Sequence, residues 1–212
     1  MRQPVQAEAL AAMGVSLLGL NFYMPSPRYV SPDLGAELAK AWGFRDSLVG
    51  LFVNSPAEEI FAVQDKVGFG IAQLHGEEPL EMIIKVAARI PVIRAFRIKD
   101  SAALDLARQE IAEIHAHGGV LHAALIDGYS ATAHGGTGAS VDRKLVESAI
   151  DLHPRLMLAG GLSPANLAER LAWIRPWAID VASGVETQPG VKDPKAVQAM
   201  LRIISERSIR CD

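Results

Sequence analysis

Residues 158–193 read LAGGLSPANLAERLAWIRPWAIDVASGVETQPGVKD, with two glycine-centred turns separated by one helical pattern and one apolar run. The first turn contains Gly160 and Gly161, and the second contains Ser183 and Gly184. In a phosphate-binding (β/α)8 barrel, the loops after the seventh and eighth strands bind phosphate through backbone N–H groups, and glycine allows the close approach. The stretch therefore predicts the last two units of such a barrel, with these four residues at a phosphate group. Tight turns without a ligand are the alternative.

The rest of the chain alternates strands and helices in the same way. Helical patterns separate seven short apolar runs of the kind found in buried parallel strands. A further helical segment, at about 5–14, precedes the first run, so there are eight helices for seven strands, whereas a closed barrel has eight of each. We therefore predict one phosphate-binding TIM-barrel domain, an α/β fold, over residues 1–212, whose first strand would lie just before Met1. The seven expected strands lie at about 16–22, 48–53, 70–74, 91–96, 119–126, 155–159 and 178–182.

Four of the expected helices begin with a capping residue followed by proline, a residue that suits the first helical position. Glu58 lies three residues after one of these caps and would complete a capping box with it. These starts mark the strand-to-helix junctions. The four pairs are Ser31-Pro32, Ser55-Pro56, Ser163-Pro164 and Asp193-Pro194.

The composition is that of one enzyme-sized domain with a small-molecule partner. The 212 residues are 50% hydrophobic and carry a net charge of −3 without a basic stripe, so neither nucleic acid nor an anionic membrane is an expected partner. Cys211 is the only cysteine, which excludes an internal disulfide and a zinc-type cluster and indicates a reducing, cytoplasmic location. The segment 1–20 does not fit a secretory signal, and no apolar run reaches transmembrane length.

Polar residues gather where the expected strands end, which in a barrel is the face that carries the active site. Two strand-to-helix loops, 23–31 and 128–141, are long, and the second contains the run Gly135–Gly138, which would let it close over a ligand. A tolerated surface loop is the alternative. The residues at the strand ends and in the loops that follow are Asn21, Arg28, Asn54, His75, Arg97, Asp127, Gly160 and Ser183.

These motifs, taken together and in this order, resemble the phosphoribosylanthranilate isomerases of tryptophan biosynthesis, and the resemblance covers nearly the whole chain. The glycine turns alone would also fit other phosphate-binding barrels. The matching motifs are GLNFY at 19–23, SPRYVSP at 26–32, VGLFVN at 49–54, QLHG at 73–76, LID at 125–127, the glycine run at 135–138, LAGGL at 158–162, DVASGVE at 180–186 and PGVKD at 189–193.

The resemblance implies an Amadori rearrangement, in which a phosphoribosyl aminoaldose opens and isomerises to the aminoketose without metal or organic cofactor. Asp127 occupies the position of the family's general acid, which protonates the ribose ring oxygen. Arg28 would bind the anthranilate carboxylate, to which a guanidinium fork is well matched. The further substrate-binding residues would be His75, Asp180, Gly136 and Gly138, beside the four residues of the glycine turns. For three of these residues a structural role is the alternative: a solvated loop arginine, a strand-end histidine and an aspartate that caps a turn.

The sequence departs from the family at one place. The family's general base is a cysteine at the end of the first strand, and both that strand and that cysteine are absent from this chain. Cys211 is a poor substitute because it follows the last helix, whose end lies toward the opposite face of the barrel.

We expect an ordinary isomerase whose chain begins too late, either through a late start codon or through truncation. The alternatives are a seven-stranded relative that binds a sugar phosphate without turnover, and another sugar-phosphate isomerase or epimerase on the same barrel. Because an open barrel leaves unpaired strand edges, either the missing strand or a compensating oligomer is favoured, and the protein is expected to be a monomer or a homodimer.

Overall fold

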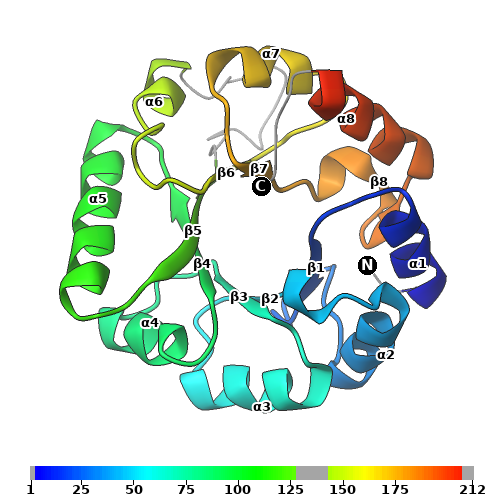
Figure 1. Ribbon diagram of the computed structural model, residues 1–212, viewed down its shortest axis with the longest axis horizontal. Coiled ribbons are helices and arrows are strands. Elements are labelled where there is room, and N and C mark those ends of the chain that lie inside the picture. Colours follow the sequence, from blue (N-terminus) through cyan, green and yellow to red (C-terminus); the bar gives the residue numbers. More distant parts are fainter. Residues whose placement is uncertain (1–2, 128–142, 207–212) are drawn as a thin grey trace.

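The computed structural model describes residues 3–127 and 143–206. Seven parallel strands form one curled sheet in sequence order, and a ring of helices surrounds it (Figure 1). The predicted α/β barrel architecture and all seven predicted strands are confirmed, although the last strand is only two residues long. The strands are β1 (Leu18–Asn21), β2 (Leu48–Phe52), β3 (Ile71–Leu74), β4 (Val92–Arg97), β5 (Leu121–Asp127), β6 (Leu156–Ala159) and β7 (Ala178–Ile179).

Each strand is followed by a helix that packs on the outside of the sheet. One helix, α1, precedes the first strand, as the sequence pattern predicts. A short antiparallel hairpin, β8 (Glu186–Gln188) and β9 (Val191–Lys192), lies outside the barrel sheet between β7 and the last helix. The helices are α1 (Pro4–Ala12), α2 (Pro32–Trp42), α3 (Ala57–Val67), α4 (Leu80–Ala87), α5 (Ser101–Ala116), α6 (Arg143–Glu147), α7 (Leu167–Trp173) and α8 (Pro194–Glu206), with 3-10 turns at Arg45–Ser47 and Ser183–Val185.

The strands are apolar on both faces because each face packs against a separate core. In β4, Ile93 and Ala95 contribute to the small cluster inside the barrel, whereas Val92 and Phe96 belong to the larger cluster between the sheet and the helices. Burial on both faces removes the alternation of polar and apolar residues, so the parallel strands read as continuous apolar runs. None of the described helices is both long enough and apolar enough to cross a bilayer.

Two of the four predicted helix starts are confirmed. Helix α2 begins at Pro32, where the Ser31 hydroxyl accepts a hydrogen bond from the Leu34 N–H at 3.2 Å. Helix α8 begins at Pro194, and the Val197 N–H donates to the Asp193 carbonyl at 3.0 Å. The combination of a capping side chain and a proline with fixed φ is sufficient to set these two boundaries.

The other two predicted starts are wrong by one and by three residues. Helix α3 begins at Ala57, because Pro56 is extended with a ψ of 149°, and the expected capping box does not form: Glu58 pairs with Lys85 instead. Helix α7 begins at Leu167, because Asn166 closes a separate turn. Its side chain accepts the Ser163 N–H and donates to the Gly161 carbonyl, both at 2.9 Å.

The barrel sheet is open between its first and last strands. Within residues 3–127 and 143–206, β1 pairs only with β2, and β7 pairs only with β6. A cavity of about 360 Å³ lies along this seam. Helices α1 and α8 are neighbours in the ring (Figure 1), and Leu10 of α1 and Met200 of α8 both line the cavity.

Side chains bridge the seam where the strands do not. The Gln6 side chain of α1 forms two long hydrogen bonds with the backbone of Lys192 in β9, at 3.4 and 3.5 Å. Arg28, in the loop after β1, forms an ion pair with Glu186 of β8. The hairpin therefore connects the end of the chain to its beginning.

Candidate active site

The seam cavity is apolar at depth and polar at the carboxyl ends of the strands. Its polar lining comes from the ends of β1, β3 and β7 and from the hairpin that follows β7. The carboxyl ends of parallel barrel strands meet at one face, which brings together residues that are far apart in the sequence. The polar lining residues toward this face are Asn21, Arg28, Gln73, Asp180, Glu186 and Lys192.

His75 and Asp127 form a pair at this face. Asp127 ends β5 and His75 follows β3 directly, and the Nε2 of the imidazole lies 3.4 Å from Oδ2 of the carboxylate. Gln73 holds the other ring nitrogen, with its Nε2 3.1 Å from Nδ1 of His75. Both members of the pair remain accessible, because the side chains of His75 and Asp127 are 18% and 33% exposed. The arrangement suits proton donation to a ligand in the barrel mouth.

Asp180 lies between the His75–Asp127 pair and the seam. Desolvation by burial raises the pKa of the Asp180 carboxyl, and electrostatic interactions with His75 and Lys192 oppose that change only in part. The Gln73 side chain, which contacts His75, also acts to lower the pKa of the Asp180 carboxyl. A carboxyl with a raised pKa can hold a proton closer to neutral pH, which is a property of groups that take part in proton transfer.

Arg28 is held by Glu186 at the seam. Its Nε lies 3.1 and 2.9 Å from the two carboxylate oxygens, and its Nη2 lies 2.7 Å from one of them. Burial by itself raises the pKa of Glu186, whose side chain is 3% exposed, but Arg28 and Lys192 together lower that pKa below its usual value. The guanidinium fork is therefore already engaged by an internal carboxylate.

Lys192 completes this group of charges. Its Nζ donates to the carbonyls of Val181 and Ala182, at 3.2 and 3.0 Å, and lies 3.3 Å from Glu186. Burial lowers the pKa of the Lys192 ammonium, although the carboxylates of Glu186 and Asp180 oppose the change. The lysine thus fixes the backbone that leads into the second glycine turn.

The two glycine turns lie against each other. Gly160 and Gly161 have φ angles of 91° and 61°, a left-handed conformation that favours glycine. Gly184 packs so closely on the Leu162 carbonyl that a Cβ at this position would overlap it. Among the described residues, no acceptor faces the N–H groups of Gly160 and Gly161. Within the described residues these two donors at the end of β6 have no protein acceptor, and an anion bound there could accept from both.

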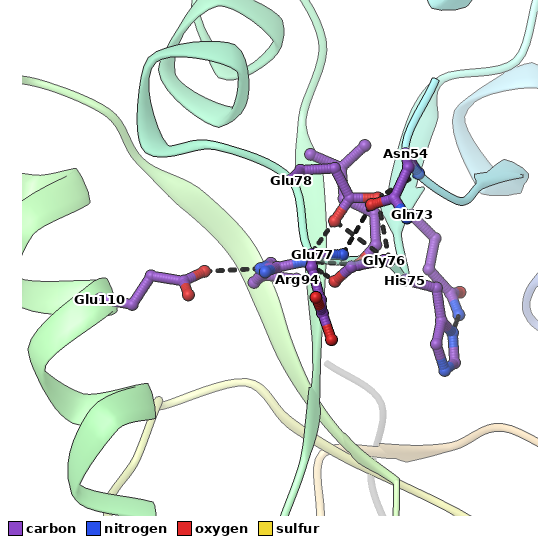
Figure 2. Close-up of polar contacts among 9 residues, drawn as sticks. Asn54, Gln73, His75, Gly76, Glu77, Glu78, Arg94 and Glu110 are labelled. Carbon is purple, nitrogen blue, oxygen red and sulfur yellow. Dashed lines mark hydrogen bonds and ion pairs between the residues drawn. The ribbon is translucent and has the colours of Figure 1, made fainter. Parts of the chain in front are cut away.

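A buried cluster of charges lies behind the loop that carries His75 (Figure 2). Arg94 of β4 is 5% exposed, and its guanidinium contacts Glu78 at 2.5 Å and Glu110 of α5 at 2.6 Å. Glu78 also accepts hydrogen bonds from the N–H groups of Asn54 and Gly76, at 3.0 and 2.9 Å. The cluster therefore joins the loops after β2 and β3.

The structure brings together most of the residues that the sequence singles out. His75, Asp127 and Asp180 are close enough to interact electrostatically, and the two glycine turns are in contact. Arg28 contacts Glu186 instead of the His75–Asp127 pair. Three predictions lie outside the described residues: the binding residues Gly136 and Gly138, the proposed lid at 128–141, and the position of Cys211.

Two polar residues at the strand ends shape loops. Asn21 Oδ1 accepts the Tyr23 N–H at 2.9 Å, and Asn54 Oδ1 accepts the Glu77 N–H at 2.7 Å. Asn54 also has a left-handed φ of 55°, which asparagine tolerates better than most residues. Their side chains therefore serve the backbone of the barrel mouth.

Sequence reasoning assigned no role to Glu186, Lys192, Glu78 or Arg94. For Arg94 a signal existed: a charged residue inside the apolar run 91–96 indicates a buried partner, because arginine is rarely buried unpaired. Glu186 and Lys192 gave no such signal, since they sit in a polar segment. The described residues contain no group of three or more His, Cys, Asp or Glu side chains suited to a metal ion.

Comparison with known proteins identifies the relatives of this chain. Residues 2–202 match the family model for N-(5'-phosphoribosyl)anthranilate (PRA) isomerase. The N-(5'-phosphoribosyl)anthranilate isomerase of Ralstonia pickettii is 36% identical over 213 residues, which cover 97% of this chain and 90% of the relative.

Solved structures agree with the sequence match. Monomers of the dimeric isomerase from Thermotoga maritima superpose with a TM-score of 0.81 at 29% identity, over 97% of this chain and 95% of theirs. An isomerase in complex with reduced 1-(o-carboxyphenylamino)-1-deoxyribulose 5-phosphate gives the same TM-score, identity and coverage. The chain belongs to the N-(5'-phosphoribosyl)anthranilate isomerase family.

Proposed function

We propose that this protein isomerises N-(5'-phosphoribosyl)anthranilate to the corresponding carboxyphenylamino-deoxyribulose phosphate, a step of tryptophan biosynthesis. The family match over residues 2–202 carries the proposal. The grouping of His75, Asp127 and Asp180 at the carboxyl ends of the strands supports it, because side chains of these types transfer protons to and from a ligand and here they lie close together.

In the proposed mechanism, Asp127 is the general acid. It donates a proton to the ribose ring oxygen, the bond from that oxygen to C1 breaks, and the ring opens to an iminium. Transfer of the C2 proton to a general base, the role of the family's strand-end cysteine that is absent from this sequence, then gives an enolamine that tautomerises to the aminoketose. His75, 3.4 Å from Asp127, is positioned to contact the same part of the substrate and to orient the carboxyl group.

We propose that the two ends of the substrate bind at opposite sides of the barrel mouth. The phosphate would bind to the N–H groups of Gly160 and Gly161, together with Ser183 and Gly184. The first turn has left-handed glycines whose N–H groups have no acceptor among the described residues, and the second packs closely against it at Gly184. Asp180 would contact the sugar between the phosphate and Asp127.

Arg28 is proposed to bind the anthranilate carboxylate. Its Nε and Nη2 face Glu186, so a ligand carboxylate has either to displace Glu186 or to bind at Nη1. In the first case, substrate binding and the ion pair at the seam compete for one guanidinium.

The test is turnover of N-(5'-phosphoribosyl)anthranilate, generated in situ and followed by the loss of its fluorescence, for the 212-residue chain and for Asp127→Asn. Loss of a general acid lowers kcat by roughly 100- to 10,000-fold. Turnover in the parent chain that disappears in Asp127→Asn supports the isomerase, provided that circular dichroism shows both proteins folded.

A folded parent chain that binds the product analogue but shows no turnover would identify the alternative, a binding relative without catalysis. Failure to bind any anthranilate-bearing ligand would favour another sugar-phosphate isomerase or epimerase. Appending a strand that ends in a cysteine then separates a true binder from an enzyme that lacks its base, because only the latter gains activity.

We further propose one phosphate-binding domain that works in the cytoplasm as a monomer or a homodimer on a small phosphorylated substrate. The single cysteine supports the location. The open seam supports a requirement for either a covering strand or a second subunit.

A further inference from the structure

His75 depends on neighbours that lie behind it in the protein. Its own N–H donates to the Phe52 carbonyl at 3.0 Å, and its ring is held by Gln73. The next residue, Gly76, has both backbone groups bound by buried side chains: Glu78 accepts its N–H at 2.9 Å, and Arg94 donates to its carbonyl at 3.0 Å. The backbone on the C-terminal side of His75 is thus fixed by an ion pair.

The ion pair is fully enclosed. The side chain of Glu78 is 0% exposed and that of Arg94 is 6% exposed, so water does not compete for their hydrogen bonds. Hydrogen bonds to charged groups in such surroundings are strong, and a buried charged group that loses its partner strongly destabilises the fold. The geometry at Gly76 is therefore stiff.

The same carboxylate ties this loop to its neighbour. Glu78 Oε1 accepts the N–H of Asn54 at 3.0 Å, while Asn54 Oδ1 accepts the N–H of Glu77 at 2.7 Å. Gly76 has no room for a side chain, because an added Cβ would overlap the Asn54 amide. These contacts join the loops after β2 and β3 directly (Figure 2).

Glu110 holds the outer side of Arg94. It reaches from α5 to Nε of Arg94 at 2.6 Å and is 31% exposed, and no hydrogen bond connects it to either loop among the described residues (Figure 2). Arg94 thus has one carboxylate that acts on the loop and one that acts only on the arginine. This difference supplies a matched control.

We propose that Glu78 and Arg94 are positioning residues, which set the direction of the His75 imidazole toward Asp127 through the backbone of Gly76. Neither residue touches the substrate. The inference rests on the proposed isomerase function, in which His75 and Asp127 face the reacting sugar. A displacement of about 1 Å in such a pair lowers a rate by up to roughly 100-fold.

The test compares Glu78→Gln with Glu110→Gln. Glu78→Gln keeps the shape but replaces one charged acceptor by an amide, so Gly76 and Asn54 lose a charge-assisted hydrogen bond. We expect kcat to fall by about ten- to a hundredfold while KM changes far less. For Glu110→Gln we expect kcat close to that of the parent chain, with some loss of thermal stability.

A second measurement does not require turnover. In the parent chain, the His75 imidazole resonances report its contacts with Gln73 and Asp127, and an Asp127→Asn variant shows how they respond when that contact changes. We expect these resonances to shift or broaden in Glu78→Gln and to stay in place in Glu110→Gln. If the parent chain proves inactive, this comparison alone decides the positioning role.

Two results would overturn the proposal. One is a pair of variants with the same kcat, which would show that the cluster contributes only to stability. The other is an unchanged His75 signal in folded Glu78→Gln, which would show that the imidazole keeps its direction without the anchor. If Glu78→Gln does not fold, Glu78→Asp and Arg94→Lys provide the same comparison with the charges retained and the geometry altered.

Discussion

At the scale of single residues, the site holds a half-buried carboxyl group whose pKa is raised. Desolvation by burial raises the pKa of Asp180, against the opposing influence of His75, Lys192 and Gln73, and with a smaller contribution from the negative charge of Asp127. Such a group lowers the stability of the protein when it ionises, since the unfolded chain loses the proton more readily. Sites of this kind often exchange stability for function.

Asp180→Asn is therefore expected to be more stable than the parent chain at neutral pH, with a smaller difference in acid. In the folded state the pKa of the Asp180 carboxyl is raised above its ordinary value of 3.8. The protonated carboxyl therefore stabilises the fold fully below pH 3.8, and this contribution is lost as the pH rises through the raised pKa of the folded state. Urea denaturation at pH 4.5 and at pH 7.5 measures the difference. A stability difference that does not change with pH would contradict this account.

At the scale of elements, the candidate phosphate site is a contact between two turns. The turn after β7 packs on the turn after β6 through Gly184 and the Leu162 carbonyl, and Lys192 fixes the backbone on the other side. A backbone atom cannot move aside as a flexible side chain can. The spacing between the two turns is thus set by the absence of a Cβ at residue 184.

Gly184→Ala is expected to separate the turns and to weaken phosphate binding by tenfold or more. Overpacking of this kind costs roughly 1–3 kcal/mol of stability. The measurement is the rise in melting temperature that inorganic phosphate produces, which should be clear in the parent chain and absent in the variant. Gly19→Ala is the stability control, because nothing lies within 4 Å of a Cβ there. Equal phosphate stabilisation in parent and Gly184→Ala would remove this turn from the site.

At the scale of the whole molecule, the open seam of the barrel is bridged by side chains. Strands β1 and β7 are not paired among the described residues, and the Arg28–Glu186–Lys192 group and the Gln6 contacts cross between them. Strand pairing would involve regular backbone hydrogen bonds along the seam, whereas these contacts join it only at a few points. We therefore expect the stability of the fold to be sensitive to individual seam residues.

Glu186→Gln is expected to destabilise the chain, because it leaves Arg28 and Lys192 as neighbouring cations without their carboxylate. Removing one partner of a buried pair costs about 3–5 kcal/mol, and the 28% exposure of Arg28 reduces the expected loss to roughly 1–3 kcal/mol. Chemical denaturation measures it. Glu147→Gln, which breaks the exposed pair with Arg143, should cost no more than about 0.5 kcal/mol. Equal losses in the two variants would show that the seam pair has no special importance.

The sequence determined the order and type of the elements. Each buried strand reads as an apolar run, and each of the helix starts at Pro32 and Pro194 has a local cap, so neither depends on distant residues. The candidate residues His75 and Asp127 follow from their places at the ends of strands, whereas Asp180 follows from the resemblance to the family. The start of α7 differs from the prediction because the Asn166 side chain accepts the Ser163 N–H and donates to the Gly161 carbonyl, which closes a separate turn before the helix.

Only the tertiary structure decided which charges meet. Arg28 and Glu186 are 158 residues apart, and Glu78 and Arg94 belong to different strand-helix units, so no local pattern pairs them. Their partners depend on how the sheet curls and on which side chains remain buried when it does. The sequence sets the elements by local steric and hydrophobic preferences, whereas these ion pairs arise because burial makes an unpaired charge too unfavourable to keep.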